Sequence, residues 1–188
     1  AKEGMKFTQA YATSVCSPTR VSLMTGMNAA RHRVTNWTLH KDKIQPMESN
    51  HGDLDFPMWN VNGITLDNSV KYAVHATSLP AILKKNGYTT IHIGKAHFGA
   101  IGTSAANPLN IGFDINIAGH AAGAPGRYYG LDNFGNNGDG SPKNIWSVPG
   151  LTEFHGKKIN LTEALTQKSI TVLDSVLKLD KPFFLYMS

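Results

Sequence analysis

Apolar positions along the chain recur at two spacings, which together predict a mixed α/β fold. A three-to-four-residue spacing predicts helices over 19–25, 78–86 and 162–179. Alternation or β-branched runs predict strands over 5–12, 88–93, 112–117 and 183–187. The last of these (PFFLYMS at 182–188) has a continuous apolar run, which is typical of a strand buried on both faces. The order of helix, glycine, strand and glycine turn indicates a mostly parallel sheet flanked by helices.

Two long stretches interrupt this pattern. Residues 27–77 are polar and aperiodic, and we interpret them as a surface excursion and an insertion. Residues 119–140 are rich in glycine and asparagine and predict a long loop near a ligand or the surface. The length of 188 residues suits one domain or part of a larger one, so both stretches are expected to belong to the same domain as the rest of 1–188.

Composition narrows the possible classes of protein. Of the 188 residues, 41% are hydrophobic, which is enough for a core. No apolar run reaches the roughly 18 residues of a membrane-spanning helix. The net charge of +5 comes from scattered residues, so no nucleic-acid partner is predicted. The lone cysteine excludes an intrachain disulfide framework and a cysteine-cluster zinc site, and the histidine spacings do not match a zinc motif.

Cys16 is the first candidate for chemistry. It lies at a predicted strand-to-helix junction, where free backbone N–H groups and the helix dipole favour an anion or a deprotonated nucleophile. Arg20 follows one turn later and is expected to reach residue 16. The alternative is structural: a small buried thiol beside a surface arginine.

Two segments carry a resemblance to a known family. CSPTR at 16–20, followed by LMTG at 23–26, resembles the C-x-P-x-R…TG signature of the type I sulfatases. GYTTIHIGKAHFG at 87–99 resembles that family's G-Y-x-T…G-K-x-H-x-G segment. The beginning of the chain and the segment 182–188 resemble family segments in the same order. The resemblance implies an alkaline-phosphatase-like α/β fold, of which this chain would be a partial domain.

The resemblance also implies a reaction and its residues. The expected activity is hydrolysis of sulfate esters, with sulfated carbohydrates as the expected substrates. Cys16 would be converted to formylglycine by a maturation enzyme. Cys16 would be the nucleophile precursor and, once modified, a ligand of one divalent cation, calcium in most of the family. Arg20 would orient the formylglycine, Lys95 would bind sulfate oxygens and His97 would take a proton. The family's other metal ligands are expected outside this chain, and a secreted or periplasmic location is expected ahead of a lysosomal one.

Several residues stay outside these assignments. Asp53 and Asp55 form a D-x-D pair within 27–77 and are interpreted as solvated acids. His92 falls in a predicted strand and is expected in the core. Three loop residues could frame a substrate or simply be surface: His51, His120 and Arg127. Four aromatic residues could stack on sugar rings or pack the loops on the core: Trp37, Trp59, Tyr128 and Tyr129.

Three other functions remain open. A phosphonate or phosphate monoester hydrolase of the same superfamily would share the formylglycine, Arg20 and the metal. A non-catalytic binding protein would keep Cys16 unmodified. An intracellular thiol enzyme would need a Cys–His pair and would leave Arg20 and Lys95 without roles.

Overall fold

The computed structural model describes residues 3–44 and 57–188, and their centre is a parallel sheet of three strands in the order β2-β1-β3. These strands are β1 (Thr89–Ile93), β2 (Ile115–Ile117) and β3 (Phe183–Met187). Ile91 of β1 lies opposite Ile115 on one side and Leu185 on the other. The predicted parallel α/β architecture is confirmed.

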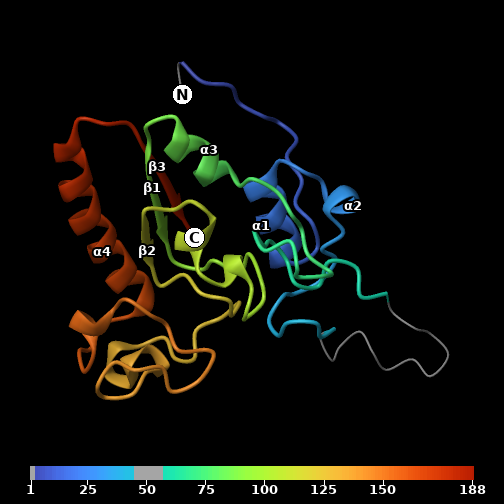
Figure 1. The fold of residues 1–188 in the computed structure, drawn as a ribbon. Coiled ribbons are helices and arrows are strands. Elements are labelled where there is room, and N and C mark those ends of the chain that lie inside the picture. Colours follow the sequence, from blue (N-terminus) through green and yellow to red (C-terminus); the bar gives the residue numbers. More distant parts are fainter. Residues whose placement is uncertain (1–2, 45–56) are drawn as a thin grey trace.

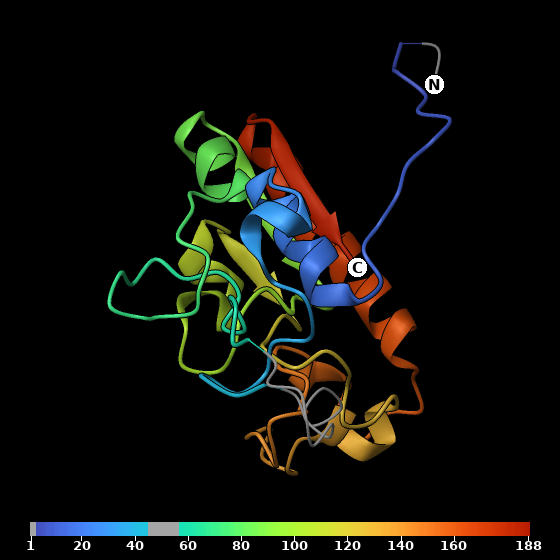
Figure 2. The same cartoon turned by 90° about the vertical axis from the view of Figure 1, so that its right-hand side faces the viewer.

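Helices cover both faces of this sheet, as Figures 1 and 2 show. Helix α4 (Leu161–Val176) packs against Ile91 and Ile93 on one face. The other face carries helices α1 (Cys16–Thr25), α2 (Ala29–His32) and α3 (Leu79–Lys85), with an apolar cluster that includes Phe98 and Phe113. Side chains alternate along β1, so one strand supplies both layers.

The helix ends follow local sequence signals. The Ser78 side chain accepts a hydrogen bond from the Ala81 N–H at the start of α3, and Asn160 accepts one from the Thr162 N–H at the start of α4. After Val176 the chain tightens into the 3-10 helix η6 (Leu177–Leu179) and turns at Asp180, whose φ is +49°. The predicted helices over 78–86 and 162–179 are thus confirmed, the second with a 3-10 end.

Two strand predictions need correction. Residues 5–12 form no strand, and Met5, Phe7 and Tyr11 are largely exposed, because alternation produces a strand only where a neighbouring strand supplies hydrogen bonds. Strand β3 forms as predicted but is not buried on both faces. It is the edge of the described sheet, with Phe183 and Met187 partly exposed.

The interpretation of 27–77 as a surface excursion is also wrong for its described parts. Val34 and Ile64 are completely buried in the apolar cluster beneath α1. Isolated bridges join His40 to Ile101, Gly63 to Gly99 and Ile64 to Val74. These short contacts have no periodicity that a sequence pattern could reveal. Asp53, Asp55 and His51 lie outside the described residues, and the insertion itself stays a prediction.

The segment from 119 to 160 builds a small second apolar cluster. The predicted loop 119–140 contains the 3-10 helix η4 (Gly130–Gly135), and η5 (Thr152–Phe154) lies further along. Phe134, Leu151 and Phe154 pack together there against the start of α4. Two short 3-10 helices, η2 (Ser104–Ala106) and η3 (Pro108–Ile111), lie between β1 and β2.

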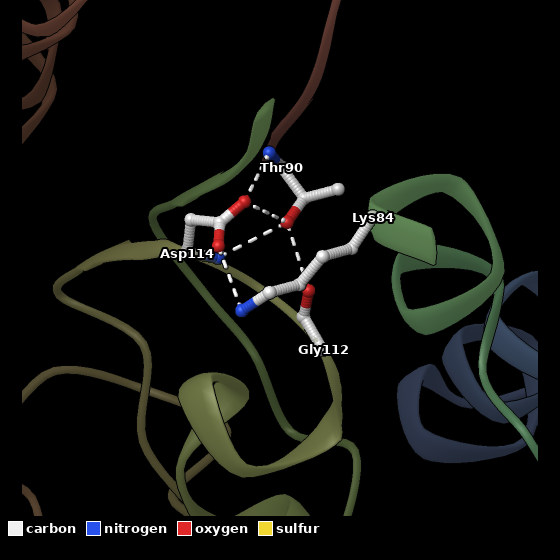
Figure 3. Close-up of polar contacts among 4 residues, drawn as sticks. All are labelled: Lys84, Thr90, Gly112 and Asp114. Atoms are coloured by element: carbon white, nitrogen blue, oxygen red, sulfur yellow. Dashed lines mark hydrogen bonds and ion pairs between the residues drawn. The ribbon is translucent and has the colours of Figure 1, made fainter. Parts of the chain in front are cut away.

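A polar cluster joins α3 to the beginnings of β1 and β2 (Figure 3). The Asp114 carboxylate accepts hydrogen bonds from the Thr90 N–H at 2.9 Å and hydroxyl at 3.0 Å, and pairs with the Lys84 ammonium at 2.7 Å. The Thr90 hydroxyl also lies 2.8 Å from the Gly112 carbonyl oxygen.

In the described parts of the chain, no helix combines the length and apolar character needed to cross a bilayer.

Candidate active site

Cys16 and His97 meet although 81 positions separate them in sequence. Cys16 is the first residue of α1, and its Sγ lies 3.2 Å from the Nδ1 of His97. The cap residue Val15 provides no side-chain hydrogen bond to the first turn of α1. The thiol therefore lies beside helix N–H groups without a side-chain cap, at the positive end of the helix dipole.

A hydrogen bond at the other ring nitrogen of His97, Nε2, determines which tautomer the ring adopts. Nε2 lies 2.8 Å from the carbonyl oxygen of Thr38, which can only accept, so Nε2 carries the proton. Nδ1 is then free to accept a hydrogen bond from the Cys16 side chain. His97 adopts a left-handed backbone conformation, with φ of +52°, that directs its ring to this position.

His97 is neutral at physiological pH. Burial, together with the nearby charge of Lys95 and smaller effects from Arg20 and His120, lowers its pKa to about 4. Its side chain is only 3% exposed. At neutral pH the Nδ1 of His97 is therefore an unprotonated base beside the Cys16 side chain.

Arg20 contacts the residues that flank this site through its guanidinium group. Its guanidinium donates hydrogen bonds to the Lys95 carbonyl oxygen at 2.8 Å, the Tyr186 hydroxyl at 3.2 Å and the Ser188 hydroxyl at 2.8 Å. No hydrogen bond joins it to Cys16, although both residues line one shallow hollow at the start of α1. Arg20 thus ties α1 to the ends of β1 and β3, and its predicted role toward residue 16 stays a prediction.

Lys95 lies just past the end of β1 and shares a cavity with Cys16 and His97. This cavity has a volume of about 290 Å³. In the part of the chain that is described, the Lys95 ammonium has no carboxylate partner. The cavity is lined by Cys16, Trp37, Leu39, Lys95, His97, Gly123, Ala124 and Trp146. Lys95 and His97 both line this cavity, although His97 has a left-handed backbone and not the extended one under which residues two apart face the same side.

A second cavity of about 210 Å³ lies on the other side of Lys95, Gly123 and Ala124. His120 lines it and is half-buried rather than fully solvated. Its Nδ1 lies 3.1 Å from the Ala118 carbonyl oxygen, while its Nε2 is buried without a partner among the described residues. Burial lowers the pKa of His120. Tyr128 also lines this cavity.

The other candidate residues lie away from both cavities. His92 is completely buried, as expected, and stacks on Tyr186. Trp59 packs under the guanidinium of Arg33. Arg127 and Tyr129 line neither cavity, and Tyr129 is half exposed.

The described residues do not form a calcium site by themselves. They contain no group of three or more histidine, cysteine or acidic side chains placed to hold a metal ion. Among the described residues no carboxylate lines the cavity, and the charged side chain that lines it is that of Lys95. Calcium requires several oxygen ligands, usually including carboxylates. The role of Cys16 as a metal ligand therefore stays a prediction.

Sequence reasoning missed four contributors to the site. Thr38 acts through its backbone carbonyl, which leaves no trace in residue type. Tyr186 reaches Arg20 from the edge strand. Gly123 lies against the His97 ring, where an added Cβ would come within 2.4 Å of Cε1. Trp146 could have been found only as an aromatic residue in a polar loop.

Comparison with known proteins supports the family that the two sequence motifs resemble. The family model described as Sulfatase matches residues 1–188. The chain is 28% identical to the uncharacterized sulfatase YdeN of Escherichia coli K12, covering 99% of this chain and 29% of that protein. It is 29% identical to the N-acetylgalactosamine-6-sulfatase of Mus musculus, covering 99% of this chain and 32% of that protein. The chain thus spans about a third of these relatives' length.

Solved structures agree on the fold. PsFucS1 sulfatase from Pseudoalteromonas sp. superposes with a TM-score of 0.56 at 19% identity, over 100% of this chain and 36% of that one. Ps i-CgsB, in complex with k-i-k-neocarrahexaose, superposes with a TM-score of 0.53 at 20% identity, over 93% of this chain and 34% of that one. With the family match over its whole length, the chain belongs to the sulfatase family.

Proposed function

We propose that the protein hydrolyses sulfate esters, with a nucleophile derived from Cys16. One observation carries this proposal: the Cys16 side chain faces the unprotonated Nδ1 of His97 at 3.2 Å, in a cavity that Lys95 also lines. A nucleophile, a base and a cation thus face one space. Membership of the sulfatase family then selects sulfate as the group transferred.

Each side chain has a task that follows from its position. The Lys95 ammonium would hold sulfate oxygens and stabilise the charge that grows on them during transfer. His97 would accept a proton at Nδ1 from the residue-16 side chain, because Thr38 keeps its Nε2 proton in place. Arg20 would act as a positioning residue, since its hydrogen bond holds the Lys95 backbone against α1.

Formylglycine at residue 16 is part of the proposal. Its hydrate supplies one hydroxyl to attack sulfur and a second whose deprotonation expels sulfate. A dedicated maturation enzyme would make this modification. The proposal includes calcium as a family property, with its remaining ligands outside the described residues. The location proposed for the protein is secreted or periplasmic.

A sulfated carbohydrate is the substrate class we propose. The support comes from named relatives: one is an N-acetylgalactosamine-6-sulfatase and one structural neighbour holds k-i-k-neocarrahexaose. Both cavities beside Lys95 offer room for groups attached to the sulfate.

The Cys16–His97 contact also favours a second candidate, a thiol hydrolase. Such enzymes activate cysteine with histidine, commonly as a thiolate–imidazolium pair. Here burial holds the pKa of His97 at about 4, which disfavours the imidazolium. The thiol hydrolase also leaves the Lys95 cation in the cavity without a task, so sulfate transfer accounts for more of the site.

The test compares three substrates and one alkylating reagent. The protein, produced with a formylglycine-forming maturation enzyme, is assayed on p-nitrophenyl sulfate, p-nitrophenyl phosphate and a p-nitrophenyl phosphonate. We expect the sulfate to be preferred, Cys16→Ala to abolish turnover, and iodoacetamide to leave the mature enzyme active. Preference for the phosphonate would establish the superfamily alternative. Full inactivation by iodoacetamide would establish the thiol hydrolase.

A further inference from the structure

Part of the wall of the main cavity is apolar and aromatic. Once Cys16, Lys95 and His97 are assigned to the sulfate group, the remaining described lining residues are Trp37, Leu39, Gly123, Ala124 and Trp146. These five described residues are uncharged and mostly apolar. This part of the wall suits a substrate group that presents an apolar face.

The backbone next to Trp37 is hydrogen-bonded to residues of the site. The neighbouring Thr38 accepts the His97 Nε2–H through its carbonyl oxygen at 2.8 Å. The Thr38 N–H donates to the Ser17 hydroxyl at 3.2 Å, one residue from Cys16. The backbone beside Trp37 is thus held by His97 and by Ser17, the residue next to Cys16, so the backbone that carries the indole is tied to the site.

Trp146 is held from the other side. Its carbonyl oxygen accepts a hydrogen bond from the Gly126 N–H, and its own N–H donates to the Asn144 side chain at 2.9 Å. These bonds join the loop carrying Gly123 and Ala124 to the turn carrying Trp146. Trp146 nevertheless remains 37% exposed, so it is available to a ligand at the cavity wall.

The cavity has room for one ring beside the sulfate. A cavity of about 150 Å³ holds a benzene molecule, and this one measures about 290 Å³. Indole faces bind the flat apolar face of a ring, either aromatic or pyranose. Both kinds of ring offer the same chemistry to the wall.

We propose that Trp37 and Trp146 form a ring-binding wall that selects sulfate esters of six-membered rings over those of acyclic groups. This inference rests on the proposed function and adds its specificity. Sulfate binding by Lys95 and ring binding by the two tryptophans are separate contributions to affinity, so each can be measured without the other.

The test measures binding in the absence of turnover, in the full protein with Cys16→Ala. Dissociation constants are determined by calorimetry for inorganic sulfate, methyl sulfate, phenyl sulfate and galactose 6-sulfate. We expect Trp37→Ala and Trp146→Ala each to weaken at least one ring ester by about tenfold. Methyl sulfate and inorganic sulfate should change by less than about twofold. Comparison of phenyl sulfate with galactose 6-sulfate identifies which ring the wall prefers.

Two further variants exclude indirect effects. Trp59→Ala is the matched control, because Trp59 packs on Arg33 and lines neither cavity; it should leave all four constants unchanged. Trp146→Phe keeps a ring and should retain most of the affinity for ring esters. Thermal unfolding of each variant shows whether it is folded.

The outcomes separate this inference from the proposed function. If sulfate binding depends on Lys95 but the tryptophan variants leave ring esters unaffected, the inference is wrong and the proposed function stands. Equal weakening of methyl sulfate and ring esters would also overturn the inference. If inorganic sulfate binds no better with Lys95 than with Lys95→Ala, the proposed function fails and the inference falls with it.

Discussion

Lys95 and His97 show how much of a site two spaced residues can predict. With one residue between them just past a strand, their side chains would face one pocket if the chain stayed extended. Both line the cavity beside Cys16, but the chain is not extended at His97. The same spacing says nothing of the left-handed backbone at His97 or of the Thr38 carbonyl that fixes its tautomer. Any residue type can supply a backbone carbonyl, so this partner could not be predicted from the sequence.

Replacement of Lys95 by alanine tests its proposed contact with sulfate. We expect kcat/KM on p-nitrophenyl sulfate to fall by about 10² or more, because one transition-state charge contact is lost from an enclosed site. Lys178→Ala is the matched control, since Lys178 is exposed on η6 and lines neither cavity. A change of less than about threefold at Lys95 would remove it from the site.

Gly123 tests the placement of the His97 ring. A Cβ at this position would lie 2.4 Å from Cε1 and 2.6 Å from Nδ1 of His97, so Gly123→Ala must displace the ring or the loop. We expect kcat to fall by about 10²-fold, the effect of a misplacement of about 1 Å. Gly138→Ala, where the added Cβ meets nothing within 4 Å, should retain full activity. Normal kcat in Gly123→Ala would show that the His97 position is not critical.

The regular elements were more predictable than the irregular ones. Helices α3 and α4 have caps and an apolar face, and strand β1 has a β-branched run between glycines, so local sequence determines them. Residues 5–12 have the alternation of a strand without a described neighbour. The described part of 27–77 contributes core residues through isolated bridges, for which no sequence period exists.

The cluster around Asp114 tests how α3 is joined to the sheet (Figure 3). Burial alone would raise the pKa of Asp114, but hydrogen bonds from Lys84 and Thr90 hold it below the ordinary value. Asp114→Asn removes the ionic partner of Lys84 and weakens the bonds from Thr90. We expect the free energy of unfolding in urea to fall by about 1–2 kcal/mol. Asp174→Asn, on a position of α4 without an ion pair among the described residues, should change it little; equal effects would contradict the account.

At the scale of the whole molecule, the sheet brings the two sulfatase signatures together. Helix α1 lies on the face of the sheet opposite α4 and presents Cys16 to the loop that follows β1, while Arg20 bonds to the ends of β1 and β3. Two buried neutral histidines lie in this same layer. His92 packs among Phe98, Phe113 and Tyr186, and His97 faces Cys16.

These histidines make stability depend on pH. Burial lowers the pKa of both His92 and His97 from 6.5 to about 4. Between those values the unfolded chain binds more protons than the folded one, so stability is full above pH 6.5 and is lost as the pH falls toward 4. We expect the free energy of unfolding to drop by about 2 kcal/mol for each imidazole between about pH 7 and about pH 5.

Urea unfolding at the two pH values checks this expectation. His92→Gln removes one of these groups and should reduce the pH-dependent loss by the roughly 2 kcal/mol expected for one imidazole. The variant is compared with itself at the two pH values, so its own lower stability does not affect the result. An unchanged pH dependence in His92→Gln would show that His92 is not a source of this effect.

The central claim, that Cys16 supplies the nucleophile of a sulfatase, is tested most directly by mass. Protein produced with a formylglycine-forming maturation enzyme is digested, and the mass of the peptide containing residues 16–20 is measured by mass spectrometry. The same preparation is assayed on p-nitrophenyl sulfate. Conversion of the thiol to the aldehyde should lower the peptide mass by about 18 Da, and turnover should rise in proportion to the converted fraction. Full turnover with an unconverted Cys16 thiol would contradict the account.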